Sequence, residues 1–198
     1  MAWADSGKAS LKVVLVDYSK CTGCRTCETV CSSHNRPVTI GGEKLPGLGN
    51  PRYANIRVES FNPEVDIPNV CAMCADTPCV NACPVKPDPK TGRRALYRDE
   101  ATRTIHNDPV RCIGCRSCAK ACAEQRTGVI TPDFKTGRPE RMCTLCGGDP
   151  QCVKRCPFQA LSYVEVRADR KFYGFPPEKI AAEFAKNWYG TADFGGLR

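Results

Sequence analysis

Cysteine is the residue type in this sequence that could do the most chemistry, and all sixteen cysteines fall into four groups of four. The first and third groups have the spacing C-x2-C-x2-C-x3-C, whereas the second is C-x2-C-x4-C-x3-C-P and the fourth is C-x2-C-x5-C-x3-C-P. In chain order the groups are Cys21, Cys24, Cys27 and Cys31; Cys71, Cys74, Cys79 and Cys83; Cys112, Cys115, Cys118 and Cys122; Cys143, Cys146, Cys152 and Cys156. Runs of cysteines at such short spacings bind iron–sulfur clusters through iron–thiolate bonds. The sequence therefore predicts four [4Fe–4S] clusters, with iron bound by all sixteen cysteines.

The spacing within each group also indicates how a cluster is surrounded. Cysteines two residues apart can follow the corners of one cube if the loop between them turns tightly, and Gly23 and Gly114 permit such a turn. The fourth cysteine lies three residues further on, in a helical segment that points away from the loop. In two-cluster bacterial ferredoxins this fourth cysteine binds the other cluster. The residues thus favour an exchange of fourth cysteines but do not decide which groups exchange them.

The groups alternate along the chain, so the sequence repeats internally. Residues 17–27 recur in similar form at 108–118. This predicts an α+β fold of two pseudo-symmetric, bacterial-ferredoxin-like modules, each with two clusters, short helices and small antiparallel hairpins. The first expected module is residues 1–103 and contains an insertion at 35–70. The second module is residues 104–166, and a C-terminal extension follows at 167–198. The two modules are expected to be intertwined by shared cluster ligation.

Composition argues against several other classes of protein. A zinc protein is the remote alternative, but zinc ribbons use two separated pairs of cysteines rather than runs of four.

Met1–Ser10 has no long apolar stretch, so we expect no signal peptide, no membrane span and a cytoplasmic location where thiols stay reduced. The net charge of +8 would be balanced by four thiolate-ligated clusters of about −2 each. Nucleic-acid binding is therefore not expected.

Local patterns predict the elements that carry the cysteines. Hydrophobic residues fall to about 33% once the cysteines are left out, so we expect metal binding to supply much of the folding free energy. Expected strands are 12–16, 53–61, 95–97, 103–106 and 160–166, the last three suiting hairpins after the second and fourth groups. Expected helices are 27–34, 118–126 and 177–188, the last with Pro177 in its first turn and Gly190 just past its end. Expected loops are 35–52 and 84–92. The last helix places Ile180, Phe184 and Trp188 on one face, which either packs on its own domain or docks on a partner.

The order of the four groups, with the extra residues at Cys74-x4-Cys79 and Cys146-x5-Cys152, resembles the four-cluster ferredoxin subunits of the dimethyl-sulfoxide reductase family over about residues 11–166. Within that family the size and the tail look most like the small electron-transfer subunits of tungsten aldehyde oxidoreductase and class II benzoyl-CoA reductase complexes. This resemblance implies nested ligation, in which the first group exchanges fourth cysteines with the fourth group and the second with the third. The implied ligand sets are Cys21, Cys24, Cys27 and Cys156; Cys71, Cys74, Cys79 and Cys122; Cys112, Cys115, Cys118 and Cys83; Cys143, Cys146, Cys152 and Cys31.

The resemblance also implies a role. Such a subunit has no catalytic residues of its own and relays single electrons to or from a large tungsten- or molybdenum-pterin catalytic subunit, with a ferredoxin or further subunit as the other partner. The alternative is a free polyferredoxin that shuttles electrons between enzymes. The insertion at 35–70 and the tail favour a bound subunit, because a free shuttle needs neither.

Overall fold

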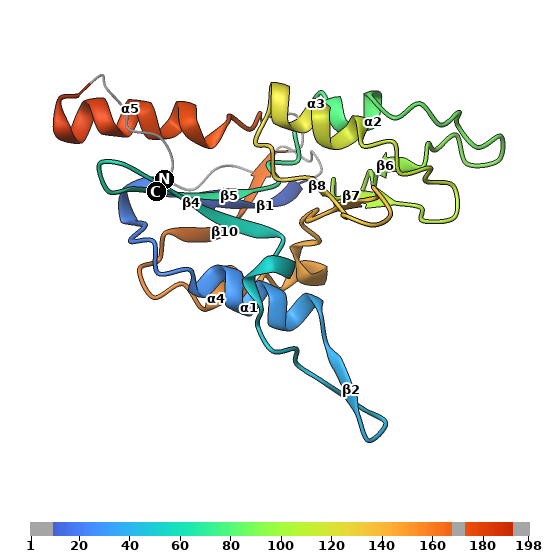
Figure 1. Cartoon of the computed structure of the whole chain (residues 1–198), viewed down its shortest axis with the longest axis horizontal. Coiled ribbons are helices and arrows are strands. Elements are labelled where there is room, and N and C mark those ends of the chain that lie inside the picture. Colours follow the sequence, from blue (N-terminus) through green and yellow to red (C-terminus); the bar gives the residue numbers. More distant parts are fainter. Residues whose placement is uncertain (1–9, 168–172, 192–198) are drawn as a thin grey trace.

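The computed structural model describes residues 10–167 and 173–191, so residues 1–9 and the parts of the tail at 168–172 and 192–198 lie outside the description. The described chain is a mixed fold of short helices and two-stranded antiparallel sheets (Figure 1). The sheets pair β1 (Ser10–Val16) with β10 (Leu161–Arg167), β2 (Val38–Ile40) with β3 (Glu43–Leu45), β4 (Ile56–Phe61) with β5 (Val65–Val70), β6 (Leu96–Arg98) with β7 (Ile105–Asn107), and β8 (Thr131–Pro132) with β9 (Pro139–Glu140). The α-helices are α1 (Thr26–Asn35), α2 (Pro78–Asn81), α3 (Ser117–Gln125), α4 (Gln151–Lys154) and α5 (Pro177–Tyr189).

The longest strand pairing joins the two ends of the cysteine-containing region. β1 runs antiparallel to β10 from Ser10 opposite Arg167 to Val16 opposite Leu161. The sequence led us to expect β10 in a hairpin after the fourth group, and this expectation was wrong because its partner is the strand that precedes the first group. The pairing continues where the Asp17 N–H donates to the Ala160 carbonyl at 2.8 Å. The sheet therefore brings the start of the first cysteine group beside the end of the fourth.

The four helices of the cysteine groups pack in two pairs. α1 of the first group packs against α4 of the fourth, and α2 of the second group packs against α3 of the third. Both longer helices, α1 and α3, lie within a residue or two of their predicted positions. Each starts after an arginine in the left-handed region, at Arg25 and Arg116, which turns the chain sharply from the cysteine loop into the helix.

The insertion is more regular than the sequence predicts. The expected loop at 35–52 contains the β2–β3 hairpin, whose turn uses the positive φ angles of Gly41 and Gly42. The expected strand at 53–61 begins later, at Ile56, after a 3-10 turn at Pro51–Tyr53. Its partner β5 was not predicted, because nearly all of its residues are buried and no polar–apolar alternation marks it.

The tail helix α5 begins at Pro177, as predicted, and ends at Tyr189, one residue beyond the predicted end, with the left-handed Gly190 as its C-cap. It packs on β4 and β5, where Ala181 and Ala185 are fully buried against Phe61, Val65 and Ile67. Ile180 and Phe184 pack against this cluster, whereas Trp188 is 45% exposed. The apolar face of the tail thus covers its own domain for most of its length. Among the described residues, no helix is long and apolar enough to cross a bilayer.

A buried carboxylate joins the first cysteine helix to the sheet of the insertion. Glu28 of α1 is completely buried, and its Oε1 accepts a hydrogen bond of 2.6 Å from the N–H of Val58 in β4. The Nη1 atom of Arg25 lies 3.5 Å from the same oxygen. The carboxylate therefore satisfies a buried backbone donor on a different element.

Replacing Glu28→Ala should destabilise the loaded protein by about 1–3 kcal/mol, because the Val58 N–H loses its acceptor. The measurement is the urea concentration at which half of the visible cluster absorbance disappears. Glu183→Ala, on the exposed side of α5, serves as the control. Equal midpoints for the two variants would contradict a structural role for the Glu28 carboxylate.

Candidate functional site

Three of the four implied ligand sets each line a separate pocket. Cys21, Cys24, Cys27 and Cys156, hereafter the Cys21 set, line the first. Cys143, Cys146, Cys152 and Cys31, the Cys143 set, line the second. Cys112, Cys115, Cys118 and Cys83, the Cys112 set, line the third. In every case three cysteines come from one group and the fourth comes from another.

The remaining set is identified by the electrostatic contacts among its thiols. Cys79 lies close enough to Cys71, Cys122 and Cys74 that each raises the pKa of its thiol, after the larger effect of burial. After burial, the pKa of Cys71 is raised by Cys143 of the neighbouring set and, to a smaller extent, by Cys74 and Cys122. Cys71, Cys74, Cys79 and Cys122, the Cys71 set, therefore also lie together in space.

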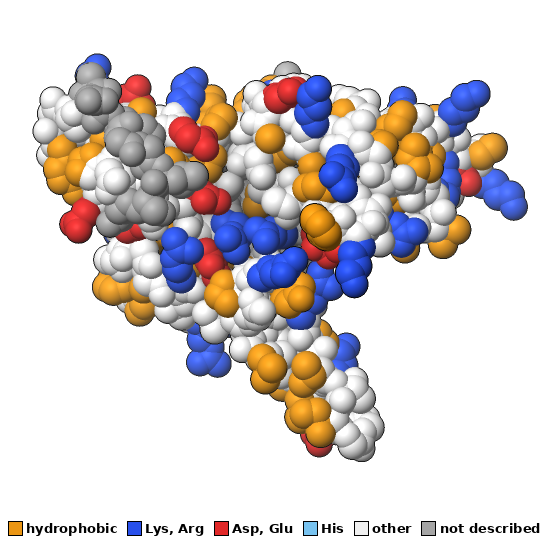
Figure 2. Space-filling view, in the orientation of Figure 1, with side chains coloured by type: hydrophobic (Ala, Val, Ile, Leu, Met, Phe, Trp, Pro, Cys, Tyr) orange, Lys and Arg blue, Asp and Glu red, His pale blue; other side chains and the backbone are white. Residues whose placement is uncertain are grey.

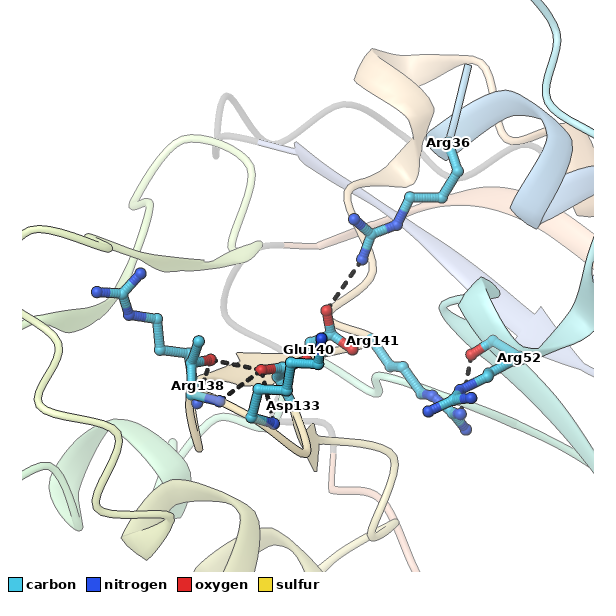
Figure 3. Close-up of polar contacts among 8 residues, drawn as sticks. Arg36, Arg52, Asp133, Arg138, Glu140 and Arg141 are labelled. Atoms are coloured by element: carbon cyan, nitrogen blue, oxygen red, sulfur yellow. Dashed lines mark hydrogen bonds and ion pairs between the residues drawn. The ribbon is translucent and has the colours of Figure 1, made fainter. Parts of the chain in front are cut away.

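The fourth group is positioned by contacts with the insertion and with α1 (Figure 3). Arg36, just after α1, forms an ion pair of 3.2 Å with Glu140 in β9. Arg141 donates from Nη2 to the carbonyl of Arg52 at 2.9 Å. On the same hairpin Asp133 accepts a hydrogen bond of 2.7 Å from the N–H of Thr136 and stabilises the turn between β8 and β9. These contacts connect segments far apart in sequence just before Cys143.

Several N–H groups point at cysteine sulfur atoms in the described chain. In the Cys143 set, Cys31 Sγ accepts from the backbone of Asn55 at 3.2 Å and from Asn35 Nδ2 at 3.5 Å. In the Cys21 set, the N–H of Ala160 donates to Cys156 Sγ at 3.3 Å. Sequence reasoning missed these donors, because most are backbone groups that carry no residue-type signal. Hydrogen bonds of this kind stabilise metal-bound thiolates and tune their electronics.

Burial makes these thiols poor acids on their own. It raises the pKa of Cys27, Cys143 and Cys152 to about 12 each, with neighbouring charged groups as smaller causes. A buried thiol with such a pKa stays protonated at neutral pH, and only a bound cation makes the thiolate favourable. Binding of metal must therefore release protons from these sites.

The donor sets fit [4Fe–4S] clusters. Each contains four sulfur ligands, and a cube of this kind takes four cysteine thiolates, each bound to a different iron. In the Cys21, Cys112 and Cys143 sets the thiols line a pocket and do not converge on one point. Within residues 10–167 and 173–191, no three cysteine, histidine or acidic side chains are arranged to hold a single metal ion. When bound, such a cluster accepts and donates one electron at a time.

Comparisons with known proteins extend this picture. A family model described as "4Fe-4S binding domain" matches residues 13–36. The polyferredoxin-like subunit of the aliphatic sulfonate oxidoreductase of Pyrococcus furiosus is 34% identical over 144 residues, which cover 72% of this chain and 70% of that protein. The putative electron transport protein YsaA of Escherichia coli is 30% identical over 158 residues, which cover 78% of this chain and 90% of that protein.

One solved structure is also similar. It is the active site complex BamBC of benzoyl-CoA reductase with benzoyl-CoA, one chain of which aligns at 24% identity with a TM-score of 0.42, over 82% of this chain and 84% of that chain. The two relatives in the preceding paragraph align over most of their own lengths. The likeness in sequence therefore extends well beyond the segment that the family model matches.

A glycine in the third group offers a test of how tightly the loops pack. Gly114 has a φ of +70°, and a Cβ there would collide with the carbonyl oxygen of Thr136 in the β8–β9 turn. Gly114→Ala should distort the Cys112 set and remove about one quarter of the bound iron, measured as iron per chain.

Gly147→Ala is the matched control. Its φ of +66° imposes a similar backbone strain, but nothing lies within 4 Å of the added Cβ. This variant should retain nearly all of its iron. If both alanine variants bind the same amount of iron, the close packing of Gly114 against Thr136 is not needed for the site.

Proposed function

The chain belongs to the family of polyferredoxin-like [4Fe–4S] electron-transfer proteins, and from this premise we propose that it is the electron-relaying subunit of an oxidoreductase complex and carries four [4Fe–4S] clusters. The observation that carries the proposal is the grouping of the cysteines into four sets of four, each drawn from two groups of the sequence. All sixteen cysteines are used, which supports four clusters over a smaller number. We assign one cluster to each of the Cys21, Cys71, Cys112 and Cys143 sets.

The contacts between sets support a linear order for the relay. Cys152 of the Cys143 set lies near Cys27 of the Cys21 set. Cys71 lies near Cys143, which connects the Cys143 set to the Cys71 set. The Cys71 and Cys112 sets share a buried core that contains Cys79, Cys122, Cys83 and Cys118. We therefore propose that electrons pass along the order Cys21 set, Cys143 set, Cys71 set and Cys112 set, in either direction.

The exposure of the cysteines supports exchange of electrons at the two ends. Cys24 is exposed in the Cys21 set and Cys115 is exposed in the Cys112 set. Every cysteine of the two inner sets is buried or half-buried. Buried inner sites protect the relay from solvent, whereas the outer sites can approach a partner. The simplest arrangement that uses this order of sets has one partner at each end of the relay.

The partner that we propose is a large tungsten- or molybdenum-pterin catalytic subunit, as in the dimethyl-sulfoxide reductase family that the cysteine pattern resembles. The relative from P. furiosus is named as a subunit of an oxidoreductase, which is consistent with a bound rather than a free protein. The β2–β3 hairpin extends from the body of the molecule, and hydrophobic side chains lie along this arm (Figure 2). Ile40 in β2 is 63% exposed, and Leu48, beyond the end of β3, is 95% exposed. An arm with an exposed apolar side chain such as Ile40 suits a permanent contact better than a shuttle that must remain free.

Native purification under anaerobic conditions tests this function. The proposal expects about sixteen irons per chain, a large second subunit at a fixed ratio, and tungsten or molybdenum in that complex. Metal analysis and the subunit ratio on a denaturing gel give the result. A fully iron-loaded chain that purifies alone would favour the free shuttle, and zinc in place of iron would refute the electron-transfer role altogether.

A further inference from the structure

The segment just before α5 lies against the Cys71 set. The backbone N–H of Gly174 donates to Cys74 Sγ at a distance of 3.4 Å, although the two residues are one hundred positions apart in sequence. Gly174 is buried, whereas Tyr173 and Phe175 on either side are exposed. The tail thus delivers one backbone donor to a sulfur atom of an inner site.

With Thr127 in place, only glycine allows this approach. A Cβ on residue 174 would collide with Cγ2 of Thr127 and would lie 3.1 Å from the Cβ of Ala72. The φ angle of Gly174 is not in the left-handed region, so the requirement is for space and not for an unusual backbone conformation. Asn69 holds Thr127 in place by donating from Nδ2 to its carbonyl at 2.8 Å.

A charged side chain supports the same contact. Arg126 forms an ion pair with Asp76 and stacks over the ring of Tyr173, with its Cζ 5.3 Å from the ring centroid. Burial raises the pKa of the Cys74 thiol. The Gly174 N–H and the positive charge of Arg126 both lower this pKa, and the carboxylate of Asp76 raises it by a smaller effect. The hydroxyl of Thr127 lies 3.8 Å from the sulfur of Cys122 in the same set. Arg126, Thr127 and the tail therefore converge on two sulfur atoms of this set.

We propose that residues 173–175 form a cap that sets the reduction potential at the Cys71 set, in which the Gly174 amide and the Arg126 guanidinium stabilise the reduced form. This inference rests on the proposed function, since it needs a cluster at that set. Reduction adds negative charge that spreads onto the sulfur ligands. A hydrogen bond and a positive charge at those ligands stabilise the reduced form more than the oxidised form. The cap therefore raises the potential of this inner step of the relay.

The cap also gives the tail a second role. α5 packs on β4 and β5 through Ala181 and Ala185, which fixes the end of the segment that contains Gly174. Docking of the helix thus holds the amide against Cys74. The reduction potential at the Cys71 set therefore depends on the packing of α5, as the stability of the fold does.

The experiment is a redox titration of the cluster-loaded protein, or of its complex if it purifies as one, followed by electron paramagnetic resonance. In Gly174→Ala one of the four midpoint potentials should shift downward while the other three stay unchanged. Arg126→Gln should lower the same potential. Thr127→Ser removes the methyl group that a Cβ at 174 would meet but keeps the hydroxyl, so Thr127→Ser with Gly174→Ala should bring the potential back toward the wild-type value.

Gly190→Ala is the control within the tail. It strains the left-handed end of α5, where nothing lies within 4 Å of the added Cβ, and should leave all four potentials unchanged. Unchanged potentials in both Gly174→Ala and Arg126→Gln, or an equal shift of all four, would overturn the cap. If Gly174→Ala fails to retain its clusters, the midpoint potentials of Arg126→Gln alone decide whether the cap sets the potential. A wild-type protein without iron would instead refute the proposed function, so the two failures are distinguishable.

Discussion

This structure depends on one constraint, which is that a buried thiol cannot ionise by itself. Half of the sixteen cysteines are buried, and burial raises the pKa of thiols such as Cys27 and Cys143 to about 12. Bound iron would stabilise the thiolates and so link metal binding to folding. In the proposed ligation each set takes its fourth cysteine from another group, so the same bonds would also tie distant parts of the chain together.

The helices and sheets serve this exchange. The pairing of β1 with β10 brings Cys21 to Cys156, and the packing of α1 on α4 brings Cys31 to the fourth group. Apolar side chains such as Ile56 and Leu96 pack among the cysteines, and the strands come only in pairs. The packing of α5 on β4 and β5 contains no cysteine, and the segment just before α5 presents the Gly174 amide to one of the sets. Electron transfer and stability therefore depend on the same elements.

The sequence predicted the local structure well where residue types determine it. The short spacing of cysteines located α1 and α3, and Pro177 with Gly190 located α5. The partner of β10 was missed, because a strand pattern does not say which distant strand it will meet. β5 was missed because burial of both its faces removes the alternation that marks a strand. The role of Gly174 was also invisible, since it depends on a backbone N–H and on the space beside Thr127.

The most direct test of the exchanged fourth cysteines is alkylation mapping of Cys156→Ser in the loaded protein, read by mass spectrometry, with Cys83→Ser as the control. If Cys156 completes the Cys21 set, its loss should open Cys21, Cys24 and Cys27 to the reagent while Cys143, Cys146 and Cys152 stay protected. Cys83→Ser should instead open the cysteines of the Cys112 set. Labelling of Cys143, Cys146 and Cys152 in Cys156→Ser, with Cys21, Cys24 and Cys27 protected, would contradict the exchange.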